Sequence, residues 1–133
     1  MTTELTMLAL SVLLLFVLAL IQAAIGVRAI GYGPLSGSRD DLPAPSILMA
    51  RAKRVVDNHR EGLTIFAPLI LIAALAHVSN GMTALGAELF FFSRVAHAVA
   101  YHFGLPHVRP LIFGVGAVGT VLVLVQVLRA AFA

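Results

Sequence analysis

Two rows of charged and polar side chains interrupt otherwise apolar stretches of the chain. The first row recurs every three or four residues and consists of Arg51, Arg54, Asn58 and Glu61. The second row, at positions i, i+3 and i+7, consists of Arg94, His97 and Tyr101. Side chains at these intervals share one face of a helix. Because guanidinium groups bind carboxylates through two parallel hydrogen bonds, the arginine-rich rows favour an anionic ligand.

Two other interpretations of these rows stay open. A polar network between helices can fix the register of a bundle without binding anything. Anionic lipid head groups also attract arginines that cluster near a membrane surface. Within the rows we expect Arg94 to pair with Glu61, because an unpaired buried carboxylate would be strongly destabilising.

The composition predicts which elements must position these side chains. Of the 133 residues, 60% are hydrophobic and 11% are charged, and the mean hydropathy is +1.01. Such values are typical of an integral membrane protein. A helix needs about 20 apolar residues to cross a bilayer. We therefore predict an all-α membrane bundle of one domain, with four spans at about 5–29, 47–78, 82–103 and 110–131.

The segment at about 31–46 is the one substantial loop, because it concentrates Gly, Pro, Ser and Asp. Basic residues surround it at Arg28, Arg39, Arg51, Lys53 and Arg54. The positive-inside rule places this loop in the cytoplasm and both termini on the opposite side. The turn at about 102–109 is then cytoplasmic too, so the two polar rows lie at one depth and can face each other.

Other motifs in the sequence do not indicate a dinucleotide site, a metal site or nucleic-acid binding. Gly114, Gly116 and Gly119 form a G-x-G-x-x-G pattern, but no strand precedes it, so we interpret it as close helix packing rather than a dinucleotide site. The chain has no cysteine and its five histidines lack convergent spacing, so we expect no metal site. Most basic residues flank apolar segments, which favours membrane topology over nucleic-acid binding.

Arg109 directly precedes Pro110, a residue suited to the first turn of the fourth span. A cation beside a helix N-terminus can stabilise an anion or a thiolate, since the free N–H groups and the helix dipole add to its field. The simpler alternative is that Arg109 is a topological anchor.

Two segments resemble the MAPEG family, the membrane-associated proteins in eicosanoid and glutathione metabolism. The segment RAKRVVDNHREGLTIF at 51–66 is similar to the family's R-x-x-x-N-x-x-E pattern. The segment FFSRVAHAVAYHFGLPHVRP at 91–110 resembles its R-V-x-H-x-x-x-Y signature, followed by the arginine that opens the fourth helix. The likeness is greatest to microsomal glutathione transferases and prostaglandin E synthase, and it covers essentially the whole chain.

What this resemblance implies is a homotrimer of four-helix bundles in a bacterial inner membrane, with glutathione bound between subunits near the cytoplasmic face. Glu61 would take the amine of the tripeptide, Arg28 would reach in from the neighbouring subunit, and Arg109 would stabilise the thiolate. The implied glutathione-binding residues are Arg28, Arg54, Asn58, Glu61, Arg94, His97 and Tyr101.

The chain departs from the family pattern in three places. Asp57 stands where the relatives have a basic residue, which would weaken anion binding there. Pro110 and Phe113 replace residues with hydroxyl groups, so an activating serine or tyrosine is missing and the thiolate would depend mainly on Arg109. The linker from Tyr101 to Arg109 is one residue shorter.

Three functions stay open. The first is a glutathione transferase or peroxidase that acts on a lipophilic electrophile or hydroperoxide. The second is a non-catalytic scaffold that binds lipids or a partner, which the missing hydroxyls favour. The third is a transporter or proton relay, which would need polar groups spread across the membrane rather than gathered near one leaflet.

Overall fold

The structure is a computed structural model that describes residues 1–133, and it is all-α. Four long helices follow the predicted segments: α1 at Thr3–Ile30, α3 at Ile47–Leu75, α4 at Gly81–His102 and α5 at Arg109–Ala131. The prediction of an all-α chain with four major helices is therefore confirmed. A short helix, α2 at Tyr32–Ser36, lies within the segment predicted to be a loop. Gly31 and Gly37 flank this single turn, and its proline at position 34 falls in the first turn, where helices tolerate proline.

Capping residues and one turn residue determine where α3 begins and ends and where α4 begins. The hydroxyl oxygen of Ser46 accepts a hydrogen bond from the N–H of Met49, which starts α3. α3 ends at Leu75 rather than at Val78, because His77 turns the chain with a φ of 56°. Asn80 and Thr83 then form a capping box at the start of α4.

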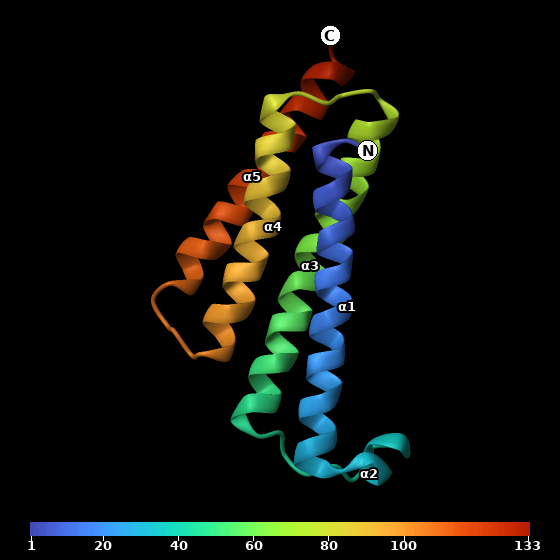
Figure 1. Cartoon of the computed structure of the whole chain (residues 1–133), viewed down its shortest axis with the longest axis vertical. Helices are drawn as coiled ribbons and strands as arrows, with labels where there is room; N and C mark the ends of the chain where they lie inside the picture. Colours follow the sequence, from blue (N-terminus) through green and yellow to red (C-terminus); the bar gives the residue numbers. More distant parts are fainter.

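The helices pack as two pairs, α1 with α3 and α4 with α5 (Figure 1). Both termini lie at the upper end in this view, together with the connection between α3 and α4. The loop around α2 and the turn between α4 and α5 lie toward the other end. This arrangement agrees with the prediction that the two termini share one side, and it brings the polar rows of α3 and α4 together.

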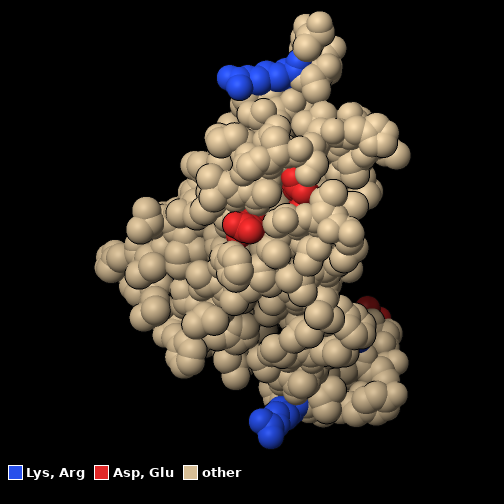
Figure 2. All heavy atoms as spheres, turned by 45° about the horizontal axis from the view of Figure 1, so that its top comes forward, with Lys and Arg blue, Asp and Glu red and all other residues tan.

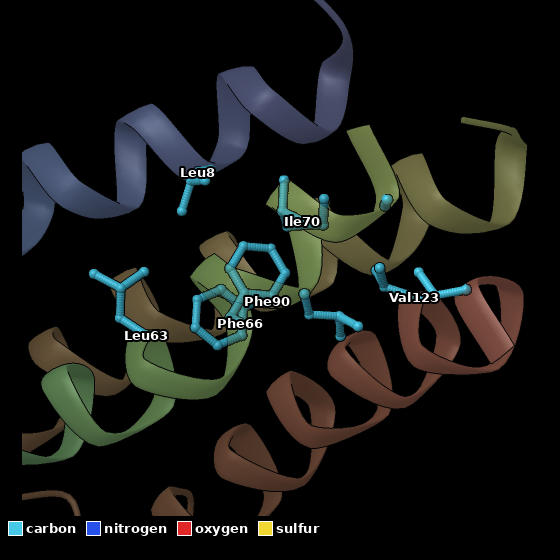
Figure 3. Packing of buried hydrophobic residues seen from close by; sticks show 10 residues of the cluster. Leu8, Leu63, Phe66, Ile70, Phe90 and Val123 are labelled. Carbon is cyan, nitrogen blue, oxygen red and sulfur yellow. The ribbon is translucent and has the colours of Figure 1, made fainter. Parts of the chain in front are cut away.

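An apolar core joins the two pairs. The rings of Phe66 on α3 and Phe90 on α4 stack with centroids 3.9 Å apart, and both side chains are fully buried. Leu8 from α1 and Val123 from α5 complete the same cluster, as Figure 3 shows. All four long helices thus contribute to one core, which holds them in a fixed register.

A buried carboxylate secures the end of the bundle that contains the termini. Glu4 on α1 is only 3% exposed and accepts hydrogen bonds from the hydroxyls of Ser79 and Thr83. The Ser79 contact measures 3.0 Å. These bonds fasten the start of α1 to the connection between α3 and α4 and to the first turn of α4.

The outer surface is mostly apolar, and charged side chains are sparse on the face in Figure 2. By length and composition, α1 and α5 could each cross a membrane. α3 and α4 carry charged residues and do not meet that criterion, although at about 1.5 Å per residue both are long enough to span the hydrocarbon core.

Glycines allow α4 and α5 to approach closely. A Cβ atom built on Gly119 would lie 2.5 Å from the carbonyl oxygen of Gly86, and one built on Gly86 would lie 2.6 Å from that of Gly119. A Cβ on Gly116 would lie 2.4 Å from the Ser93 hydroxyl, whereas Gly114 has no neighbour within 4 Å. The packing interpretation of the G-x-G-x-x-G pattern is confirmed for its second and third glycines.

Replacing Gly119 with Ala should force α4 and α5 apart, because the added methyl group meets backbone atoms that cannot rotate away. We expect a loss of about 1–3 kcal/mol in the free energy of unfolding, measured by denaturant titration in detergent micelles. Gly114→Ala is the matched control on the same helix and should leave stability unchanged or slightly higher. Equal stability of both variants would contradict the close contact.

Candidate functional site

The polar rows of α3 and α4 meet, as their predicted depth implied. The Nη1–H group of Arg94 donates a hydrogen bond of 2.7 Å to Oδ1 of Asn58. The expected ion pair between Arg94 and Glu61 is absent, and Glu61 is exposed. That expectation was wrong because Glu61 is exposed in the chain and needs no buried partner, while Asn58 accepts the hydrogen bond from the guanidinium.

A cavity of about 440 Å³ opens beside this contact. It draws residues from three helices and from the turn before α5: Asn58, His97, Tyr101, Pro106, Arg109, Pro110 and Phe113. Four residues that the sequence analysis assigned to the site therefore line one cavity, namely Asn58, His97, Tyr101 and Arg109.

Arg109 is the first residue of α5, and its side chain packs against α4. Its guanidinium carbon lies 4.5 Å above the centre of the Tyr101 ring, a cation–π contact that fixes the side chain against α4. The His97 ring lies 4.9 Å from that of Tyr101, so the three side chains form a continuous row. Pro110 occupies the first turn of α5, as predicted.

The start of α5 has no side-chain cap. Its N-cap residue, Val108, makes no side-chain cap, and Pro110 has no N–H group, so the N–H groups of Arg109 and Leu111 are the ones without a side-chain partner at the N-cap. Together with Arg109 these groups create a positive field at the cavity wall. An anion bound there would meet both a guanidinium and a helix N-terminus.

The remaining predicted residues lie elsewhere in the single chain. Arg54 lines a larger cavity of about 880 Å³ between α1, α2 and α3. Arg28 and Glu61 are exposed and line neither cavity. Arg94 is only 5% exposed and lies behind Asn58, outside the residues that line the smaller cavity.

The larger cavity also contains basic residues whose sequence positions predicted only the membrane topology. Arg39 and Lys53 line it together with Arg54. The closeness of these basic residues in the sequence, on both sides of the loop, was the signal that could have suggested a common cavity.

Asp57, the acidic departure from the family pattern, forms ion pairs with Lys53 and Arg60 on its own helix, so its charge is balanced locally. No group of three or more His, Cys, Asp or Glu side chains converges in a way that could hold a metal ion.

Comparison with known proteins identifies the family. The chain matches the MAPEG family over residues 5–129, which is most of its length and includes every residue of the smaller cavity. The chain belongs to the MAPEG family. No curated protein and no solved structure matches it. MAPEG proteins are membrane-associated helical bundles, and many of them are glutathione-dependent transferases or peroxidases.

Membership in the MAPEG family gives the apolar exterior a physical explanation. Side chains such as Phe16 and Leu20 on α1 and Leu111 on α5 are more than half exposed, which suits contact with lipid or with another subunit rather than with water.

Proposed function

We propose that this MAPEG protein is a glutathione-dependent membrane transferase or peroxidase. The observation that carries the proposal is the placement of Arg109 at the N-terminus of α5, on the wall of a cavity that also contains Asn58, His97 and Tyr101. Family membership supports glutathione as the thiol, and the apolar exterior supports a lipophilic second substrate that arrives through the bilayer.

The chemistry requires a thiolate. A thiol with an ordinary pKa is mostly protonated at neutral pH, and a neighbouring cation and helix N-terminus lower the pKa of a bound thiol. In a transferase, the thiol proton passes to solvent, the thiolate sulfur forms a bond to an electrophilic carbon, and the bond from that carbon to its leaving group, such as chloride, breaks and releases the group as an anion. In a peroxidase, the thiolate sulfur attacks the terminal oxygen of a hydroperoxide, the O–O bond breaks, and the alkoxide takes a proton from solvent and leaves as the alcohol. A second glutathione then reduces the resulting sulfenic acid to give the disulfide and water.

The complete site requires more than one subunit in this proposal. Arg54 lines a different cavity from Asn58, and Arg28 and Glu61 line neither within one chain. A homotrimer would let these residues of one subunit approach the smaller cavity of the next. In that arrangement Arg28 and Arg54 hold the carboxylates of glutathione, Glu61 takes its amine, and Arg109 faces its sulfur.

A second candidate is a binding scaffold without chemistry. Pro110 and Phe113 line the cavity beside Arg109, and neither can donate a hydrogen bond to a thiolate. A site that holds glutathione or a lipid but activates neither would be consistent with these two residues.

Titration of the detergent-solubilised protein with glutathione separates these functions. We expect saturable binding, an ultraviolet absorbance band from the thiolate, and turnover with 1-chloro-2,4-dinitrobenzene. Binding without thiolate absorbance or turnover would support the scaffold. Failure to bind glutathione would exclude both the transferase and the peroxidase.

Replacing Arg109 with Ala should reduce turnover far more than it reduces binding of glutathione, because the guanidinium acts on the developing thiolate rather than on the whole tripeptide. We expect kcat to fall at least about tenfold and the pH at which half of the bound thiol is ionised to rise. Arg109→Lys keeps the charge and should retain part of the activity. Equal losses of binding and turnover in Arg109→Ala would argue against the role.

Mixed oligomers test whether the site is shared between subunits. Subunits with Arg28→Ala and subunits with Arg109→Ala should each be nearly inactive alone. If each site takes Arg28 from one subunit and Arg109 from another, about one quarter of the sites in randomly mixed, coexpressed oligomers contain both arginines, and activity should be partly restored. Activity that stays at the level of the separate variants would place both arginines in the same subunit's site, or in none.

A further inference from the structure

Arg94 and Asn58 act as one unit, because a single hydrogen bond joins a buried arginine to a side chain that lines the cavity. We propose that Arg94 is a positioning residue that turns the NH2 group of Asn58, and not its oxygen, toward glutathione. This inference rests on the proposed function and deepens it. It identifies the ligand group that Asn58 recognises as a hydrogen-bond acceptor, either a carboxylate or a peptide carbonyl.

The Arg94 guanidinium is closely surrounded by residues of α3, α4 and α5. A Cβ atom on Gly62 of α3 would lie 3.1 Å from its central carbon, and one on Gly116 of α5 would lie 3.3 Å from Nη2. The rings of Phe90 and Phe113 face the same guanidinium at 5.0 and 5.4 Å. Three helices therefore confine the group, and it cannot swing into the cavity without losing these contacts.

This confinement determines the orientation of the Asn58 amide. An arginine side chain has only donors, so the atom of Asn58 that meets Arg94 must be the oxygen. Nδ2 of Asn58 makes no hydrogen bond within the chain, and the residue is half-buried at the cavity wall. Two N–H donors are thus directed away from Arg94 and are available to a ligand.

The ligand group opposite Asn58 must therefore accept hydrogen bonds. Glutathione has two carboxylates and two peptide carbonyls that fulfil this requirement, whereas its ammonium group would meet N–H donors and be repelled. Arg94 is not itself among the residues that line the cavity, so it would act on the ligand through Asn58, which it contacts directly.

Asn58→Asp is the decisive variant, because it keeps the shape of the side chain and an oxygen for Arg94 but replaces the donors with a second acceptor. Pairing with the buried guanidinium should leave thermal stability equal to that of the wild-type protein or higher. The affinity for glutathione, measured by calorimetry, should nevertheless fall about tenfold or more, with KM rising more than kcat falls. Unchanged or tighter binding by Asn58→Asp would overturn the inference.

A double-mutant cycle tests whether Arg94 acts through Asn58. Arg94→Met and Asn58→Ala should each weaken glutathione binding, and their combination should cost no more than the larger single loss. Arg94→Lys keeps a donor and should recover part of the affinity lost in Arg94→Met, and it replaces that variant in the cycle if Arg94→Met fails to fold. Additive losses would mean that Arg94 contacts the ligand itself, which would overturn the inference.

Two further measurements separate the possible failures. Arg129→Met, at the exposed far end of α5, is the matched control and should bind as the wild-type protein does. If the wild-type protein binds glutathione but the losses add, only the inference on Arg94 fails. If the wild-type protein binds no glutathione, the proposed function fails and the inference fails with it.

Discussion

A guanidinium buried among apolar helices constrains this bundle more than any other single group. Arg94 is 5% exposed, and its charge meets an amide oxygen and two aromatic rings rather than a carboxylate. Burial of such a group is costly unless its surroundings are arranged around it. Gly62 and Gly116 leave the space that it occupies, so the close approach of α3 and α5 to α4 and the geometry of the cavity depend on the same contact.

The two ends of the bundle have different chemistry. At the end with the termini, Glu4 accepts hydrogen bonds from two hydroxyl groups, and these bonds hold α1 to the connection between α3 and α4 and to the start of α4. Nearer the other end, Arg109, Tyr101 and Asn58 present donors and positive charge to a cavity. One end thus uses its polar groups to secure the fold, and the other leaves them available for a ligand.

Holding and activating a thiol are assigned to different residues in the proposed enzyme. The asparagine and arginine residues recognise carboxylates and carbonyls, which are present before and after the reaction and contribute uniformly to binding. Arg109 and the N-terminus of α5 favour the thiolate specifically. Since Pro110 and Phe113 cannot assist, the rate of such an enzyme would depend on how closely the sulfur approaches that single cation.

The sequence by itself determined the number and type of the long helices, the first-turn position of Pro110 and the family, because hydropathy, capping residues and local motifs depend on short stretches of chain. Only the tertiary structure decided that Arg94 pairs with Asn58 rather than with Glu61, and that Arg54 and Asn58 line different cavities. Residues four apart differ by about 40° around a helix. That rotation is enough to direct one toward α1 and the other toward α4 and α5, and which neighbour stands at each angle is a property of the packed bundle.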